Sequence, residues 1–159
     1  MKKINATAFL AIILSIGVAS AGEFSDETDR FSGVRSVVWR SIPPKGEFSV
    51  SLSAHYSEQE SFPSYYLTVL TWGDGWRYLD CRSNIWLLDG VREPRLDGEY
   101  ENDMTNNGST IERFSYQTGR DVLESLAVAD LAEFRICNDE SFVSQEDMQG
   151  IRQVLSATE

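Results

Sequence analysis

Short segments of alternating polar and apolar residues, separated by turn signals, constrain the fold of this chain more than any other feature. Residues 48–56 alternate without a break, which predicts a strand with one buried face and an opposite face that carries serines and His55. Asp-Gly dipeptides at 74–75 and 89–90 lie between apolar runs and predict tight β-hairpins, because Asp and Gly tolerate the positive φ that such turns require. The pattern predicts a meander of antiparallel strands.

The remaining segments extend this pattern and add helices near the C-terminus. A capping-box spacing at Thr118 and Asp121, and another at Ser144 and Asp147, each precede an apolar stripe of helical period. Residues 101–108 are polar and are expected to form a loop. We therefore expect an α+β fold, an antiparallel meander sheet or small sandwich of six to eight short strands with two short C-terminal helices. The expected strands cover residues 34–39, 48–56, 65–73, 76–81, 85–88, 91–93, 111–116 and 131–137.

The N-terminal segment has the pattern of a cleavable export signal. Lys2 and Lys3 are followed by an apolar run and by the small residues Ala19-Ser20-Ala21, in the order that a signal peptidase recognises. The apolar run is shorter than the about 20 residues of a membrane-spanning helix, although an uncleaved anchor is the alternative. We expect a signal peptide over 1–21, a flexible mature N-terminus over 22–32 and a single globular domain over 33–159.

The charge of the chain limits its partners. The formal net charge is −11, and removal of Lys2 and Lys3 with the signal takes it to −13. Such a chain repels phosphate backbones and anionic membrane surfaces, so we expect no nucleic-acid partner and no stable membrane anchor after cleavage. The excess of acid also favours solubility, and it leaves a basic protein partner open.

Two cysteines, Cys81 and Cys137, are expected to form one disulfide, because an isolated pair in an oxidising compartment most often does so. A redox or metal-binding pair is the alternative. The chain has no CxxC spacing and its one histidine is His55, which argues against a zinc site. We expect no metal and no cofactor.

The predicted hairpin at Asp74-Gly75 and the disulfide together assign the faces of the sheet. They place an apolar set on the disulfide side, to be covered by the C-terminal helices or to form an aromatic docking surface. Trp86, beside the second hairpin, is a further aromatic candidate. The main core is expected to hold Leu67, Val69, Trp76, Tyr78, Phe134 and Ile136. The candidate binding surface is Tyr66, Leu70, Trp72, Leu79 and Trp86.

No catalytic residue is predicted. His55 lies on the serine-bearing side of its strand, whereas a general base normally needs an orienting carboxylate and a pocket, and no GxSxG motif is present. Glu99, Glu101 and Asp103 alternate, as a glycosidase or calcium site could use them, but the favoured explanation is an acidic sheet edge that discourages strand pairing.

These observations favour an exported bacterial envelope protein that acts as a binding or accessory protein without catalytic activity. The runs 123–137 and 142–155 resemble the C-terminal ends of small exported bacterial proteins. The expected partner is a protein or a glycan, and the expected location is periplasmic or secreted. Two alternatives stay open: a small secreted hydrolase that uses paired carboxylates, and an acidic inhibitor or immunity-type protein that binds a basic partner.

Overall fold

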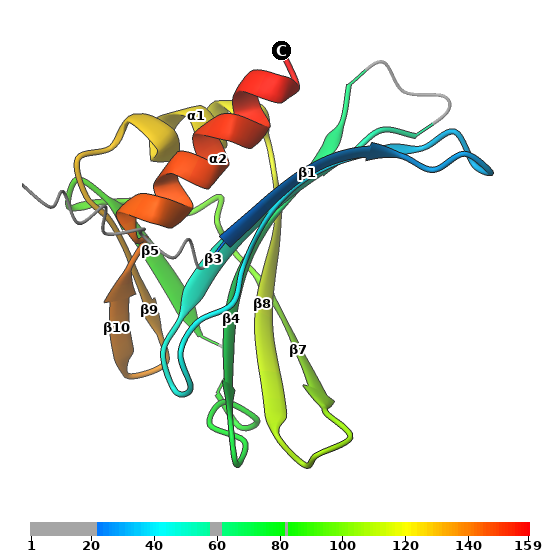
Figure 1. Ribbon diagram of the computed structural model, residues 1–159. Coiled ribbons are helices and arrows are strands. Elements are labelled where there is room, and N and C mark those ends of the chain that lie inside the picture. Colours follow the sequence, from blue (N-terminus) through cyan, green and yellow to red (C-terminus); the bar gives the residue numbers. More distant parts are fainter. Residues whose placement is uncertain (1–21, 58–61, 82) are drawn as a thin grey trace, which may run out of the picture.

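The computed structural model describes residues 22–57, 62–81 and 83–159, and its elements form two antiparallel sheets and two helices (Figure 1). The predicted α+β class is confirmed, although the described residues hold ten strands where six to eight were expected. Sheet A has the order β1-β2-β3-β4-β8-β7 and sheet B the order β10-β9-β5-β6. The strands of sheet A are β1 (Gly22–Thr28), β2 (Arg35–Ser41), β3 (Ser49–His55), β4 (Ser64–Gly73), β7 (Glu99–Met104) and β8 (Thr110–Thr118). Those of sheet B are β5 (Asn84–Leu88), β6 (Val91–Arg92), β9 (Ala132–Ile136) and β10 (Asp139–Phe142).

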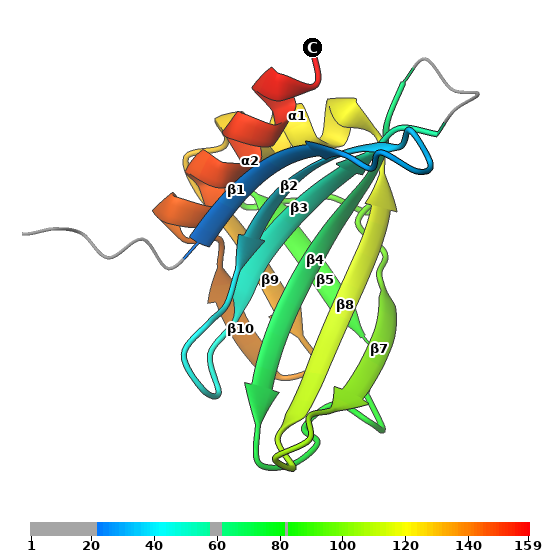
Figure 2. The same ribbon diagram turned by 45° about the vertical axis from the view of Figure 1, so that its right-hand side comes forward.

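Sheet A is strongly curved, and the two helices and sheet B all lie on one side of it (Figures 1 and 2). This side is called the inner face below, and the opposite side is the outer face. The alternation predicted for residues 48–56 is observed, since Val50, Leu52 and Ala54 are buried on the inner face of β3. Leu67 and Val69 continue the buried layer on β4.

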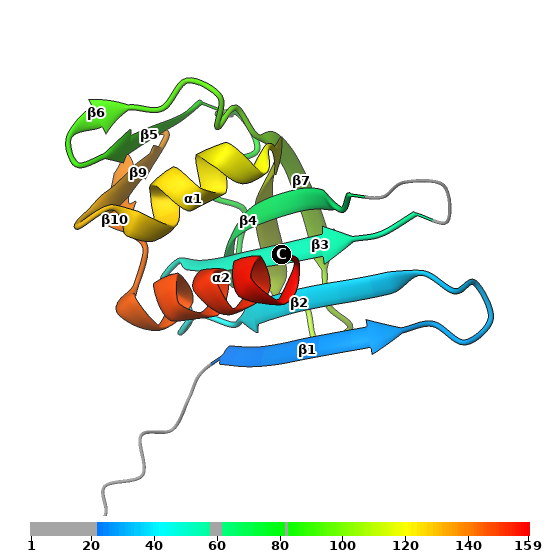
Figure 3. The same ribbon diagram turned by 90° about the horizontal axis from the view of Figure 1, so that it is seen from above.

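The helices cover one end of the inner face. Helix α1 (Arg120–Val128) packs on helix α2 (Gln145–Ala157), which in turn crosses β1, β2 and β3 (Figure 3). The capping box predicted at the start of α2 is confirmed, because Ser144 Oγ accepts the backbone N–H of Asp147 at 3.0 Å. At the start of α1 the predicted box is wrong: Gly119 is the N-cap residue, and no side chain caps it.

Trp39 on β2 links the first strand, the sheet and the last helix. A Cβ atom at Gly150 of α2 would lie 1.9 Å from its indole ring, and one at Gly22 of β1 would lie 2.0 Å from it. The indole N–H donates to the buried carboxylate of Asp147 at 3.2 Å, and Asp147 also accepts the backbone N–H of Val50 at 3.0 Å. The indole can approach both backbones this closely because neither glycine carries a side chain.

Sheet B packs against the other end of the inner face. Trp86 of β5 is fully buried and lies edge-on to Tyr116 of β8, with ring centroids 5.5 Å apart. The same indole lies 5.0 Å from the ring of Phe134 on β9. The predicted hairpin at Asp89-Gly90 is confirmed, with φ angles of 50° and 78° at its two turn residues.

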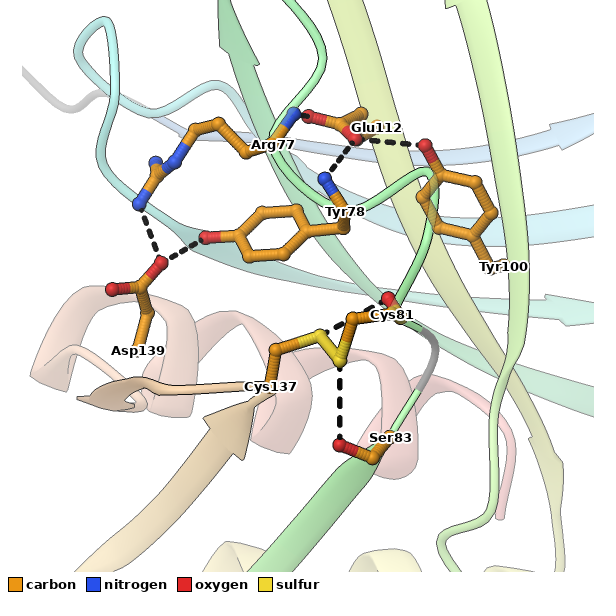
Figure 4. The surroundings of a disulfide bond; sticks show 8 residues. All are labelled: Arg77, Tyr78, Cys81, Ser83, Tyr100, Glu112, Cys137 and Asp139. Atoms are coloured by element: carbon orange, nitrogen blue, oxygen red, sulfur yellow. Dashed lines mark hydrogen bonds and ion pairs between the residues drawn. A yellow bond between two sulfur atoms is a disulfide. The ribbon is translucent and has the colours of Figure 1, made fainter.

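The segment after Asp74-Gly75 is not the strand that the sequence predicts. β4 pairs with β8 instead, from Tyr65 opposite Thr118 to Gly73 opposite Thr110. Residues 76–81 form a loop, and Glu112 of β8 holds it, because its carboxylate accepts the backbone N–H groups of Arg77 and Tyr78 at 2.9 Å each (Figure 4).

The predicted disulfide between Cys81 and Cys137 is confirmed. It ties this loop to the turn between β9 and β10, on the inner side of sheet A (Figure 4). The face assignment drawn from the hairpin is therefore wrong for the loop: Cys81 does not share a side with Trp72. Tyr78, Phe134 and Ile136 belong to the core as expected, whereas Trp76 is only half-buried.

Two further segments differ from the sequence-based expectation. The expected flexible N-terminus over 22–32 contains β1, which pairs with β2 over its whole length. The expected loop over 101–108 contains most of β7, an edge strand that pairs with β8. Edge strands tolerate polar and acidic sequences, because one side of the strand stays in water.

The expected signal peptide over 1–21 lies outside the described residues. Within the part of the chain that the structure describes, no helix is long and apolar enough to cross a membrane. The disulfide is compatible with the expected periplasmic or secreted location.

Candidate functional site

The described helices and sheet B leave the outer face of sheet A uncovered, and Figure 2 views the molecule from that side. Strand β4 sets the arrangement, because successive side chains point to opposite faces. Its inward residues Tyr65, Leu67 and Val69 are buried. The side chains that alternate with them, Tyr66, Thr68, Leu70 and Trp72, are half-buried on the outer face.

Hydroxyl groups fill the centre of this face. Thr68 lies between Ser51 of β3 and Ser115 of β8, and Tyr66 lies opposite Ser53 of β3. None of the outward residues on β3 and β4 is an acid, a lysine or an arginine, whereas Arg113 of β8 lies opposite Leu70 on this face. The chain has a formal net charge of −11. The acids of the outer face lie on its two edge strands, β1 and β7. The acids on the outer side of those edges are Glu23, Glu27, Glu99, Glu101 and Asp103.

A hollow of about 510 Å³ lies at the end of the face where β4 ends and β8 begins. Trp72 forms one wall, and its indole N–H donates to the carbonyl of Pro43 at 2.7 Å, which fixes the ring in place. The loop over 105–109 forms the opposite wall. Thr105 accepts the backbone N–H of Ser109 at 3.0 Å. The residues that line the hollow are Ile42, Leu70, Trp72, Thr105, Asn106, Asn107, Ser109 and Ile111.

The structure brings three of the five candidate binding residues together. Tyr66, Leu70 and Trp72 share the outer face of β4. Leu79 is 43% exposed but lies on the loop over 76–81, away from that face. The proposal of Trp86 as a surface residue is wrong, because its side chain is fully buried in the core.

The sequence-based reasoning missed Ile42, Ile111 and the loop over 105–109. Ile111 alternates with buried residues along β8, so its outward position was available from the pattern. The loop could not be placed from local sequence, because its position depends on the pairing of β7 with β8.

His55 lies on the outer face, as the alternation predicted. Its Nδ1 is 2.9 Å from the hydroxyl of Ser36, and its ring lies 6.0 Å from that of Tyr66. A general base is normally oriented by a carboxylate, whereas here the partner is a serine hydroxyl. The arrangement suits hydrogen bonding to a ligand better than proton abstraction.

The buried carboxylate of Glu112 serves the fold. Besides the two loop N–H groups, it accepts the hydroxyl of Tyr100 at 2.7 Å (Figure 4). Nearby, Asp139 accepts from the Arg77 guanidinium at 2.8 Å and from the Tyr78 hydroxyl at 2.7 Å. Burial, followed by the hydrogen bond to Asp139, raises the pKa of Tyr78 well above its usual value. These side chains hydrogen-bond to other parts of the protein, so we assign them a role in the fold and not in ligand binding.

A second hollow, of about 700 Å³, lies beside the end of α2. The basic residue that lines it is Arg120. The Arg120 guanidinium donates to the carbonyls of Leu155 and Thr158 at 3.0 and 3.2 Å. These bonds satisfy carbonyl groups in the last turn of the helix and at its C-cap. Arg120 is therefore engaged in the fold, and this hollow is a weaker candidate than the one beside Trp72.

Neither a metal site nor a comparison with known proteins identifies the ligand of this chain. Among the described residues, no group of three or more His, Cys, Asp or Glu side chains could hold a metal ion. No family model, curated protein or solved structure matches this chain.

Proposed function

We propose that this chain is an exported binding protein without catalytic activity, and that it binds a neutral glycan along the outer face of sheet A. The observation that carries the proposal is the composition of that face. Hydroxyl groups occupy its centre, aromatic side chains stand at both ends of β4, and the outward residues of β3 and β4 include no acid, lysine or arginine.

Sugars match such a surface in two ways. Their C–H faces pack on aromatic rings, which combine an apolar body with a polar edge. Their hydroxyl groups exchange hydrogen bonds with serine, threonine and amide side chains. Tyr66 and Trp72 are six residues apart on one strand, so their Cα atoms are about 20 Å apart. A glycan of several sugar units could contact both rings, with one end in the hollow beside Trp72.

The export part of the proposal rests on different observations. The N-terminal sequence has the order of a signal peptide, and the disulfide between Cys81 and Cys137 is typical of proteins outside the cytoplasm. The proposed location is the periplasm or the exterior of a bacterial cell.

The first prediction is a loss of glycan binding in the Trp72→Ala variant. Purified protein is titrated calorimetrically with hexasaccharides of glucose, xylose and N-acetylglucosamine, in the β1,4-linked and α1,4-linked forms that exist. We expect at least one to bind, and Trp72→Ala to weaken its binding about 5- to 30-fold, since loss of one stacked ring costs about 1–2 kcal/mol. Phe142→Ala, on exposed Phe142 of sheet B, is the control and keeps the wild-type affinity.

Two results would contradict this proposal. Binding to none of the hexasaccharides excludes a neutral glycan of these classes. An equal loss of glycan affinity in Trp72→Ala and Phe142→Ala would show that the glycan does not bind on the outer face.

The two alternatives predict different outcomes in the same experiment. A hydrolase would shorten the bound hexasaccharide, and that turnover would stop in Glu101→Gln, on the acidic edge strand β7. An acidic inhibitor would instead capture a basic protein, with an affinity that falls steeply as salt is added.

A further inference from the structure

The first residue of β1 contacts the first turn of the last helix. The backbone nitrogen of Gly22 is 3.2 Å from Oε1 of Glu146, although 124 residues separate them in sequence. Both groups are partly buried, and Glu146 lies in the N-terminal turn of α2.

The same position excludes a side chain. A Cβ atom on residue 22 would lie 2.0 Å from Cζ2 of Trp39. The indole cannot move away easily, because its N–H donates to Asp147 and its ring lies against Gly150. Position 22 therefore requires a glycine for β1 to pack against Trp39 and α2.

The residues before Gly22 have the pattern of a signal-peptidase cleavage site. Ala19 and Ala21 supply the two small side chains that such an enzyme reads, and Gly22 follows directly. We infer that the Ala21–Gly22 bond is hydrolysed, and that the Gly22 ammonium so released forms an ion pair with Glu146 that fixes β1 to α2. This inference rests on the export part of the proposed function and is independent of its ligand.

The covalent step needs only water as co-reactant. Hydrolysis of the peptide bond transfers the hydroxyl of water to the carbonyl carbon of Ala21 and a proton to the nitrogen of Gly22. The amine takes a second proton at neutral pH, because the pKa of an α-amino group is about 8. One neutral N–H donor thereby becomes three donors with a positive charge, at an unchanged position beside Glu146.

The local charges favour this change. The N-terminal end of a helix carries partial positive charge, which by itself opposes an ammonium group. The first turn of α2 also carries two carboxylates, Glu146 and Asp147, and these reverse the sign of the field. Asp147 is occupied by Trp39 and Val50, so Glu146 is the carboxylate that the ammonium contacts. Charge-assisted hydrogen bonds are stronger than neutral ones, so cleavage strengthens an existing contact.

The site of cleavage is tested first. The full chain is expressed in a bacterium, and the exported protein is characterised by intact mass and N-terminal sequencing. We expect Gly22 as the first residue. Any other first residue, or retention of the uncut chain, overturns the inference. A protein that begins at Gly22 but binds no hexasaccharide refutes the proposed ligand and leaves this inference standing.

The role of the ammonium is tested by a double-mutant cycle. A chain that begins at Gly22 and a longer chain that keeps residues 19–21 are each prepared with Glu146 and with the Glu146→Gln substitution. We expect Glu146→Gln to lower the Tm of the chain that begins at Gly22 by about 3 °C more than it lowers that of the longer chain. Glu47→Gln, which removes an exposed loop carboxylate, is the matched control and lowers both equally. Equal effects of Glu146→Gln in the two chains overturn the inference, because the lost helix-terminus interaction is common to both.

Discussion

The two faces of sheet A carry alternate residues of the same strands but differ in almost every other property. On the inner face, side chains such as Leu52, Leu67 and Phe114 are completely buried. On the outer face, Thr68, Leu70 and Trp72 are half-buried, and hydroxyl groups lie between the aromatic rings. Strand alternation thus separates the buried core from the proposed binding surface over a single backbone, so we expect that each face can be altered with little effect on the other.

The largest expected effect concerns the covalent link on the inner side. Replacement of Cys81 and Cys137 by serine lowers the free energy of unfolding by about 4 kcal/mol, because the bond closes a loop with a sequence separation of 56. Urea unfolding followed by far-UV circular dichroism measures this loss. Hexasaccharide affinity of the folded variant should stay within twofold of wild type. A weaker affinity in a fully folded sample would show that the two faces are coupled.

A matched pair of leucines on β4 compares the faces directly. Leu67→Ala removes a fully buried inner side chain and is expected to cost about 3 kcal/mol, whereas Leu70→Ala on the outer face costs about 1 kcal/mol. Chemical denaturation of both variants gives the two values. Similar losses at the two positions would mean that the outer face is covered as well as the inner one.

The smallest of the three effects concerns the buried carboxylate of Glu112, which holds the loop over 76–81. Glu112→Gln replaces one acceptor oxygen by a donor group opposite three donors, so we expect a loss of about 2 kcal/mol. Glu101→Gln, with the same chemical change on exposed β7, should stay within about 0.5 kcal/mol of wild type. Indistinguishable unfolding curves for the two variants would rule out a structural role for the three hydrogen bonds.

Local sequence predicted the parts of the fold that depend on local alternation. The strands β3, β4 and β8 follow from their period of two, and the start of α2 follows from Ser144 and Asp147. The disulfide followed from the compartment implied by the N-terminal segment.

The Asp-Gly dipeptides at 74–75 and 89–90 show where local signals fail. The same turn chemistry occurs at 89–90, where a hairpin forms, and at 74–75, where none does. Beside β4, the competing partner is β8, which pairs with it from Tyr65 to Gly73. Strand 76–81 would have offered fewer pairs, and its backbone instead bonds to Glu112. Long-range pairing therefore decided a choice that the turn residues leave open.

The candidate site was only partly accessible from sequence for the same reason. Alternation places Tyr66, Leu70 and Trp72 on one face, but the error at 74–75 added Leu79 to their side. Trp86 was chosen for its place beside a turn, and the packing of sheet B on sheet A buries it. The hollow required the loop over 105–109, which β7 and β8 bring into place.

The contact of Trp39 with both Gly22 and Gly150 has a consequence for the order of folding. The first strand and the last helix enclose the same indole, so no partial chain can complete this part of the core. A chain that emerges from its N-terminus has β1 to β4 available early, but β4 gains its second neighbour only after residues 110–118 follow. Folding must therefore wait for the C-terminus, and such high contact order slows it. Completion of this part of the core only after residues 145–157 suits the export proposed above, because passage through a narrow membrane channel requires an unfolded chain.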